Sequence, residues 1–387
     1  MEHAKHESWD VAVVGGGVAG LSVAFSSLRR GLRTIVLERG EPGGATSRVA
    51  AGMLAPTAEA ARGEEALLEL NLASAELYPG WCAELARSSG GRDPGLLRCG
   101  SLMVARDRDE AEALERELEV RLALGLRAER LRPSEARRRE PALAPTLRLA
   151  LDVPDDHAID PRRLTRALAE AIARSDGHVR AHAEVRGLLV RGERVEGVEL
   201  GDGQELLADR VVLAAGPWSG ELTGLPAAAV VPVRPVKGQI LRLRDPAGPG
   251  LLGRVLRMED GYLVPRGDGR YVLGATVEEQ GWSTEMTAGG VFELLRAARE
   301  ILPGVEEWVL EEAQAGLRPG TPDNAPVLGP SALENLFWAT GHYRNGVLLA
   351  PITGEILAAA LLGEELTGVA RGLGPERFAR LPAGVAA

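Results

Sequence analysis

Lysine and cysteine are scarce in this 387-residue sequence, whose members of these types are Lys5, Lys237, Cys82 and Cys99. Two cysteines are too few for a disulfide framework, a zinc ribbon or an iron–sulfur site, and they fit a reducing, cytoplasmic location. Arginine therefore carries nearly all the positive charge, which indicates either genomic base composition or thermal adaptation. We expect no metal site.

Long apolar runs and net positive charge are also missing. No apolar run approaches the roughly 18 residues of a membrane span. The polar stretch 1–9 leads straight into the first predicted strand, which predicts no signal peptide. The formal net charge of −10 disfavours nucleic acids and anionic membranes as partners. The length predicts two or three domains of ordinary globular composition.

A glycine motif follows the first predicted strand. The apolar run Val11–Val14 is typical of a buried parallel strand, and a helix is expected over 21–28. Between them Gly15, Gly17 and Gly20 form G-x-G-x-x-G. The first permits a tight turn, the second lets the backbone approach a pyrophosphate, and the third lets helix and strand pack closely. The helix N-terminus offers N–H groups and a positive dipole end to phosphates.

An acidic residue completes this motif. A second apolar run, Thr34–Leu37, ends in Glu38, which is placed to accept hydrogen bonds from ribose hydroxyls. Strand, glycines, helix, strand and acid in this order predict an adenine dinucleotide site. The carboxylate argues against a 2′-phosphate, so FAD or NAD is favoured over NADP. No second motif of this kind appears, which disfavours a reductase that uses a pyridine nucleotide.

Small residues dominate the next segment, 39–56. Its glycine-rich turn precedes Thr46 and Ser47, whose hydroxyls suit phosphate contacts, and the small-residue stretch 50–55. Small side chains are needed where backbone passes close to a flat ligand. The alternative is a loop with a purely structural role.

The remaining chain alternates predicted helices and strands. Helices are expected at 66–85, 109–123, 161–175, 288–302 and 347–362, with a short one opening at 133–135. Strands are expected at 96–104, 185–190, 194–200, 211–214, 232–243, 262–275 (a pair turning at 267–270) and 336–339. Asp160 and Pro161 are a predicted N-cap and first helical residue. Together these elements predict an α/β fold, with a parallel dinucleotide domain and an inserted, mainly antiparallel α+β substrate domain. The expected division is 1–86, 151–222 and 316–387 for the dinucleotide domain, and 87–150 and 223–315 for the substrate domain.

Several motifs carry a resemblance that covers nearly the whole chain. They are VVGGGVAGLSVA, ER, GATSRVAAGML, GYLVPR, AGLRPGTPDNAPVLG and GHYRNGVLLAPITGEIL. At these motifs the sequence resembles the D-amino-acid oxidase superfamily of flavoproteins, and within it the glycine oxidases that serve thiazole (thiamine) biosynthesis. The resemblance implies a Rossmann-like FAD-binding domain of glutathione-reductase type and non-covalent FAD. It also implies a small amino-acid substrate, oxygen as acceptor and a homo-oligomer. Arg48 departs from the small polar residue that some members carry.

The resemblance also implies which residues contact FAD. Glu38 would bind the ribose, Thr46 and Ser47 the phosphates, Val185 the adenine side, and Ala51–Met53 the flavin ring. The implied cofactor-binding residues are Gly15, Gly17, Val18, Ala19, Gly20, Glu38, Arg39, Thr46, Ser47, Ala51, Gly52, Met53, Val185, His342, Tyr343, Arg344, Asn345, Gly346, Val347 and Leu348.

The resemblance implies Arg318 as the clamp for the substrate carboxylate, with Tyr262 and Arg344 lining the pocket as further catalytic residues. A guanidinium suits this role because it binds a planar carboxylate through two hydrogen bonds and stays charged at any working pH. Each residue has a structural alternative: an ordinary ion pair for Arg318, a core aromatic for Tyr262, and a structural arginine for Arg344. For His342 a structural place in the turn is favoured over a catalytic one.

The expected reaction is hydride transfer from the substrate α-carbon to flavin N5, with an uncharged amine and no side-chain base. The N-terminus of a helix beginning near Gly346 would stabilise charge at flavin N1–C2=O. We expect glycine and sarcosine to be oxidised, glycine giving an imine and then glyoxylate, ammonia and hydrogen peroxide. The alternatives are a sarcosine or broader D-amino-acid oxidase or dehydrogenase and, in another class, a non-catalytic flavin-binding module.

Overall fold

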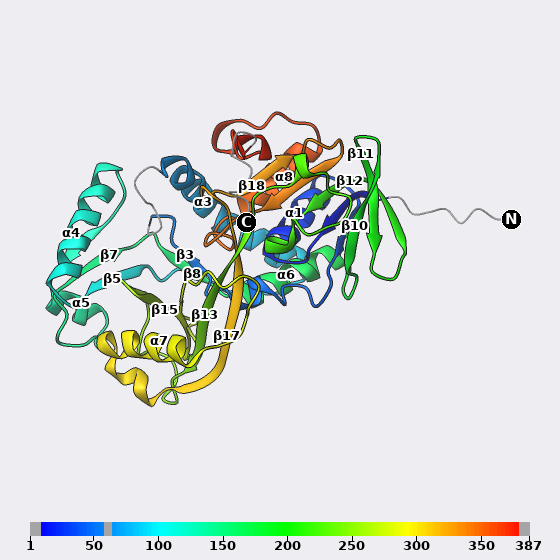
Figure 1. Ribbon diagram of the computed structural model, residues 1–387. Helices are drawn as coiled ribbons and strands as arrows, with labels where there is room; N and C mark the ends of the chain where they lie inside the picture. Colours follow the sequence, from blue (N-terminus) through cyan, green and yellow to red (C-terminus); the bar gives the residue numbers. More distant parts are fainter. Residues whose placement is uncertain (1–8, 58–63, 379–387) are drawn as a thin grey trace.

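A parallel sheet forms the first half of the molecule in the computed structural model, which describes residues 9–57 and 64–378 (Figure 1). Its strand order is β9-β2-β1-β12-β19-β18, parallel except for the last pair. The strands are β1 Trp9–Val14, β2 Thr34–Leu37, β9 His178–Arg180, β12 Glu205–Leu213, β18 Val327–Pro330 and β19 Leu336–Thr340. The hairpin of β10 Val185–Arg191 and β11 Arg194–Leu200 continues from β12.

Helices cover this parallel sheet because its central strands are apolar on both faces. They are α1 Val18–Arg29, α2 Thr46–Val49, α3 Glu65–Ser88, α6 Pro161–Ala173 and α8 Ala350–Leu361. The crossing of α1 and α8 is close at Gly354, where an added β-carbon would lie 2.6 Å from the Ser26 hydroxyl. The predicted cap of α6 is confirmed, since Asp160 accepts hydrogen bonds from the backbone N–H groups of Arg162 and Arg163.

A second, mainly antiparallel sheet forms the other half, at the lower left of Figure 1. Its order is β17-β13-β16-β15-β14-β5-β7-β6, with only β14 and β5 parallel among its paired strands in the described ranges. The strands are β5 Ser101–Ala105, β6 Glu129–Leu131, β7 Leu149–Val153, β13 Arg234–Arg244, β14 Val255–Met258, β15 Gly261–Pro265, β16 Arg270–Gly274 and β17 Val309–Gly320. The helices here are α4 Arg108–Ala123, α5 Pro133–Arg139 and α7 Ala288–Ile301.

The long pair β13 and β17 runs from this second sheet toward the first (Figure 1). Short 3-10 helices occur at η1 Gly216–Trp218, η2 Ala227–Ala229, η3 Pro303–Glu307, η4 Gly368–Ala370 and η5 Pro375–Phe378. The expected fold class, a parallel dinucleotide domain with a largely antiparallel second domain, is therefore confirmed.

Two predicted elements differ from the structure. The strand expected at 96–104 is two strands: β4 Leu96–Leu97 pairs with β8 His157–Ile159, which also pairs with β3 Met53–Leu54, whereas β5 belongs to the second sheet. The break falls at Gly100, whose φ of +70° suits glycine and turns the chain. The helix expected from near Gly346 begins instead at Ala350, with Pro351 in its first turn, where a missing N–H costs nothing.

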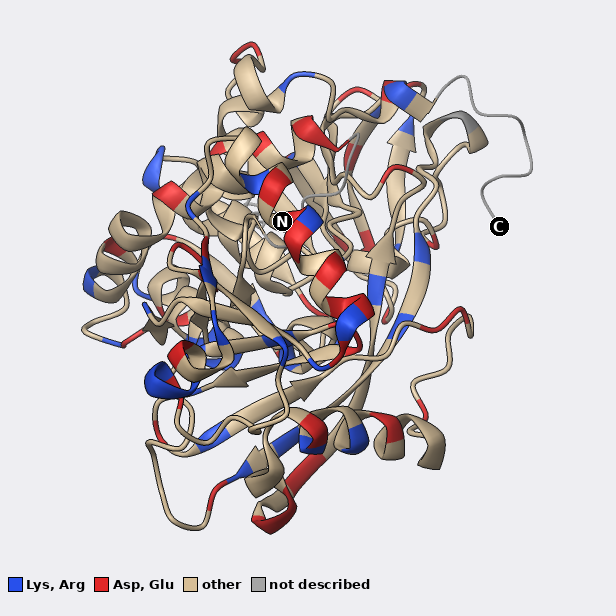
Figure 2. Ribbon diagram, turned by 90° about the vertical axis from the view of Figure 1, so that its left-hand side faces the viewer, with Lys and Arg blue, Asp and Glu red and all other residues tan. Residues whose placement is uncertain are grey.

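Charged residues of both signs alternate along the chain. Figure 2 shows blue and red segments interspersed along the helices and strands facing the viewer. Within the described ranges, no helix combines the length and apolar character needed to cross a membrane.

Candidate active site

A cavity of about 890 Å³ takes its walls from both sheets. The parallel sheet contributes the glycine turn after β1 and the acidic end of β2. The antiparallel sheet contributes residues of β13, β14, β15 and β17. Lining residues from the two sources include Gly15, Gly17, Glu38, Val185, Ile240, Tyr262 and Arg318.

The glycine turn is built to bring backbone close to a ligand. Gly15 has a φ of +108°, and a β-carbon there would lie 2.5 Å from the Ala214 carbonyl oxygen. Gly17 faces the cavity at the start of α1, where the Ser47 hydroxyl accepts a hydrogen bond from the Val18 N–H at 2.9 Å. Gly20 does not reach the cavity wall; an added β-carbon would collide with the Gly15 carbonyl oxygen. Gly20 thus serves helix–strand packing, as its place in the motif predicts.

Glu38 lies at the end of β2 on the cavity wall and is half-buried. Its carboxylate accepts hydrogen bonds from the Gly16 N–H at 2.7 Å and the Gly40 N–H at 2.8 Å. These two bonds fix the carboxylate beside the turn that would hold a pyrophosphate. Its remaining lone pairs can accept ribose hydroxyls, since a carboxylate has about four acceptor sites.

The small-residue segment after Glu38 also lines the cavity. The Thr46 hydroxyl donates to the Leu317 carbonyl at 2.8 Å and so ties α2 to β17. Ala51, Gly52 and Met53 follow on the wall. Gly52 has a φ of +76°, and any β-carbon there would collide with the Ile159 carbonyl oxygen. The tight turn of this segment therefore requires glycine.

Arg318 projects from β17 into the part of the cavity walled by the antiparallel sheet. Its Nη1 donates to the Lys237 carbonyl at 3.3 Å and to the Thr276 carbonyl at 3.1 Å. No carboxylate pairs with it among the described residues. Within residues 9–57 and 64–378, Arg318 therefore does not form the ordinary ion pair that was its structural alternative.

Tyr262 and Arg344 line the same cavity as Arg318. Tyr262 stands opposite Gly274 in the β15–β16 pair, where a β-carbon would lie 2.8 Å from the phenol oxygen. Arg344 is exposed, and its guanidinium carbon lies 5.0 Å from the centre of the Tyr343 ring. The structure thus brings the three predicted substrate residues to one cavity.

His342 is buried, with 3% of its surface exposed. Its Nε2 lies 2.9 Å from the Thr353 hydroxyl of α8. Burial lowers the pKa of His342 to about 4, so the ring is neutral at ordinary pH. This contact supports a structural role for His342 in the turn, rather than a catalytic one.

Most of the predicted cofactor residues reach the cavity wall. They are Gly15, Gly17, Val18, Ala19, Glu38, Arg39, Thr46, Ser47, Ala51, Gly52, Met53, Val185, His342, Tyr343, Arg344, Gly346 and Val347. Gly20, Asn345 and Leu348 do not line it. The Asn345 N–H donates to the His342 carbonyl, and the Leu348 carbonyl accepts from the Ser74 hydroxyl at 2.7 Å. These two residues hold the turn before α8.

Sequence reasoning missed a tryptophan at the dinucleotide end. Trp218 lines the cavity, with the guanidinium carbon of Arg39 4.0 Å from its ring centre and Trp282 stacked on it at 5.8 Å. A cation over an aromatic face is attractive. The sequence signal was indirect: Trp218 lies two residues after Gly216, where the chain after the predicted strand 211–214 is expected to come close to the cofactor.

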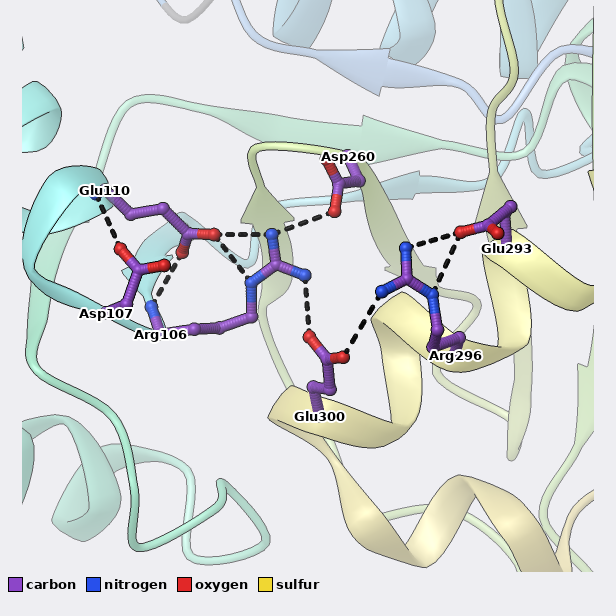
Figure 3. A network of polar contacts seen from close by, with 7 residues as sticks. All are labelled: Arg106, Asp107, Glu110, Asp260, Glu293, Arg296 and Glu300. Atoms are coloured by element: carbon purple, nitrogen blue, oxygen red, sulfur yellow. Dashed lines mark hydrogen bonds and ion pairs between the residues drawn. The ribbon is translucent and has the colours of Figure 1, made fainter.

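A charged network at the edge of the same cavity was also missed (Figure 3). Arg106 bonds Asp260 at 2.8 Å and Glu300 at 2.9 Å and also pairs with Glu110, while Arg296 pairs with Glu293 and Glu300. Asp260, Glu293 and Arg296 line the cavity. The pairs Arg106–Glu110 and Glu293–Arg296–Glu300 have helical spacing, but the contacts of Arg106 with Asp260 and Glu300 join distant segments, which no local sequence pattern could reveal.

The backbone and polar groups that line the cavity fit a flavin adenine dinucleotide. A backbone cradle that excludes β-carbons meets the N-terminus of α1, where phosphates bind well. A fixed carboxylate follows where ribose hydroxyls are expected. With the dinucleotide placed there, Ala51–Met53, Tyr262 and Arg318 surround the rest of the same cavity, where a flavin ring would lie.

Comparison with known proteins agrees with this site. A family model described as FAD dependent oxidoreductase matches residues 10–360. The bifunctional protein ThiO/ThiG of Synechocystis sp. is 36% identical over 375 residues, which cover 95% of this chain and 54% of that protein. The chain thus spans about half the length of such bifunctional relatives. A glycine oxidase of Geobacillus kaustophilus is 35% identical over 354 residues, covering 90% of this chain and 92% of that protein.

Solved structures give the same relationship. The crystal structure of glycine oxidase from Geobacillus kaustophilus superposes with a TM-score of 0.88 at 32% identity, covering 95% of this chain and 98% of that one. The chain therefore belongs to the FAD-dependent oxidoreductase family of the D-amino-acid oxidase type and is an enzyme similar to glycine oxidase.

Proposed function

We propose that this enzyme oxidises glycine with oxygen and water to glyoxylate, ammonia and hydrogen peroxide, with FAD held non-covalently. The observation that carries the proposal is the position of Arg318. Its guanidinium lies in the dinucleotide cavity, beyond the expected phosphate site, and makes no ion pair among the described residues. A guanidinium in this position suits the planar carboxylate of an amino acid.

The residues of the chain would bind and orient the substrate. Arg318 would take its carboxylate, and Tyr262 and Arg344 line the same cavity. FAD, when bound, supplies a hydride acceptor. His342 lines the cavity, but its ring is neutral and its Nε2 contacts the Thr353 hydroxyl, so no side-chain base is assigned. The amine must then arrive uncharged, and we expect the rate to rise toward alkaline pH.

Glycine is proposed over larger amino acids because the relatives named glycine oxidase match this chain over most of both lengths. Sarcosine should also react. A methylene in a pocket is worth only about 1–3 kcal/mol, so D-alanine and D-proline should be slower but measurable substrates. A sarcosine or broader D-amino-acid oxidase remains the second candidate.

The wider setting is part of the same proposal. Likeness to ThiO/ThiG proteins supports a place in thiazole biosynthesis, where the imine or glyoxylate would be consumed. We further propose a cytoplasmic homo-oligomer whose FAD-binding domain comprises 1–86, 151–222 and 316–387 and whose substrate domain comprises 87–150 and 223–315.

Anaerobic mixing of purified holoenzyme with glycine, sarcosine and a panel of D-amino acids tests the proposal. Glycine should bleach the oxidised flavin absorbance, and aerobic turnover should yield equal amounts of glyoxylate and hydrogen peroxide. Rapid bleaching by a bulky D-amino acid with none by glycine would favour the second candidate. No bleaching by any amine would remove an amino-acid oxidase role.

A further inference from the structure

A guanidinium lies directly behind the small-residue segment of the cavity wall. The Arg266 side chain, at the end of β15, donates from Nη2 to the Ala51 carbonyl at 2.6 Å and from Nη1 to the Ile159 carbonyl at 3.3 Å. Its Nε is buried without a hydrogen-bond partner among the described residues. Arg266 itself is not part of the cavity wall, whereas Ala51 and Gly52 are.

This position is electrostatically costly. Burial lowers the pKa of Arg266 and the neighbouring guanidinium of Arg162 lowers it further, whereas the carboxylates of Asp160 and Asp268 raise it. Burial also lowers the pKa of Arg242 to about 10. Asp160 and Asp268 lie near Arg266, but within the described ranges neither forms an ion pair with it. A buried charge without a paired carboxylate is rare unless other groups stabilise it.

The neighbouring arginines show that this segment is held from behind through its carbonyls. Arg242 donates to the Arg48 carbonyl at 2.8 Å, and Arg162 donates to the same oxygen at 3.3 Å. Glu312 pairs with Arg162 at 2.6 Å and so balances part of this charge. Arg266 differs from both because its acceptor, the Ala51 carbonyl, belongs to a residue on the cavity wall.

Peptide geometry then fixes the direction of the next N–H group. The Ala51–Gly52 peptide is trans, so its carbonyl and its N–H point to opposite sides. The carbonyl points away from the cavity, toward Arg266, and the Gly52 N–H therefore points toward the cavity. A charged donor at the carbonyl polarises the peptide and strengthens the N–H as a donor.

The dinucleotide motif decides what that N–H faces. With the adenine and phosphates at Gly15, Gly17 and Glu38, the flavin ring must occupy the remaining part of the cavity, against Ala51–Met53. We propose that Arg266 is a positioning residue that acts on the flavin through the Ala51–Gly52 peptide and stabilises the reduced, more negative ring. This goes beyond the proposed function and depends only on FAD, not on which amine is oxidised.

The midpoint potential of the bound flavin tests this role without any substrate. The substitution Arg266→Gln removes the charge, while the glutamine amide still offers a donor to the Ala51 carbonyl. We expect the two-electron reduction equilibrium to fall about tenfold, which is a fall of about 30 mV in potential. Arg266→Lys, which keeps the charge, should lie between Arg266→Gln and wild type. Arg270→Met, which removes an exposed arginine of the following strand, is the matched control and should leave the potential unchanged.

The measured potentials either support or overturn the role of Arg266. The proposal would be overturned if Arg266→Gln retains FAD and its flavin midpoint potential equals that of wild type. A variant that loses FAD is reconstituted at saturating FAD, and Arg266→Lys then decides: a potential below that of Arg270→Met supports the role and an equal one refutes it. Glycine turnover plays no part in these readings, so failure here is distinct from failure of the substrate assignment.

Discussion

The guanidinium of Arg318 lies directly over Gly238 of the neighbouring strand. A β-carbon on Gly238 would collide with both terminal nitrogens and the central carbon of that guanidinium. Gly238 lies between the buried side chains of Lys237 and Gln239 in β13, and both Gly238 and Arg318 line the cavity. Glycine within a strand often marks such a close approach. The bare backbone at Gly238 is therefore what lets Arg318 reach its position.

Gly238→Ala should accordingly displace the carboxylate clamp. Because small misplacements of binding groups are costly, we expect kcat/KM for glycine to fall about 10- to 100-fold with FAD content unchanged. Steady-state kinetics and flavin absorbance measure the two quantities. Gly289→Ala is a suitable control, since a β-carbon there meets nothing within 4 Å. Wild-type kinetics in Gly238→Ala would show that Arg318 is not confined by this contact.

Replacing Arg318 itself should separate substrate binding from cofactor binding. Arg318→Ala should reduce kcat/KM by a factor equivalent to about 2–5 kcal/mol, the usual loss when one partner of a buried charged pair is removed. Arg318→Lys should recover only part, because an ammonium cannot reproduce the planar fork. Titration of apoprotein with FAD should give wild-type affinity in both. Normal glycine oxidation by both variants would place the carboxylate elsewhere.

Glu38 should matter for FAD rather than for substrate. Its carboxylate already accepts two backbone N–H groups, so Glu38→Ala removes the expected ribose contact and leaves Gly16 and Gly40 without their acceptor. We expect FAD affinity to fall by about 1–3 kcal/mol, the scale of hydrogen bonds to charged groups. Glu38→Gln, which keeps one acceptor oxygen, should lose less. Fluorescence titration of apoprotein gives the affinity, and unchanged values would remove Glu38 from the site.

The sequence predicts local structure here better than it predicts contacts between distant segments. The run from β1 to Glu38 was predictable because buried strands, turn glycines and a helix follow one another without interruption. The cap at Asp160 was predictable for the same reason, since it depends on neighbouring residues. The strand break at Gly100 was not, because only the pairing of β4 and β5 with different sheets reveals it.

In the candidate site, too, local motifs were predictable and contacts between distant segments were not. The resemblance placed Arg318 and Tyr262, and the structure brings them to one cavity. It could not reveal Trp218, Arg106 or Arg266, whose partners lie on other elements of the fold. Their importance depends on burial and orientation, which a linear pattern does not contain.

Denaturation of the protein should release unmodified FAD. Cys82 is buried within α3, and burial raises the pKa of its thiol to about 12, so it is not a reactive thiolate. Cys99 does not line the cavity, and burial raises the pKa of its thiol as well. Neither is placed to form a bond to the flavin. Acid or heat precipitation should therefore leave yellow supernatant with unmodified FAD, whereas flavin retained in the pellet would contradict non-covalent binding.

His342 should make the protein less stable in acid. Its pKa is about 4 in the folded state, against an ordinary value of 6.5, because burial disfavours the charged ring. Between these two pH values the unfolded chain binds the proton and the folded protein does not, so stability falls as pH drops through 6.5 and levels off below 4. The full effect is about 3 kcal/mol.

His342→Gln retains a polar partner for Thr353 but cannot take the proton, so its melting temperature at saturating FAD should fall less between pH 6.5 and 4 than that of wild type. His178→Gln, at an exposed position, should follow wild type. Parallel curves for His342→Gln and wild type would show that the buried ring does not govern the acid limb.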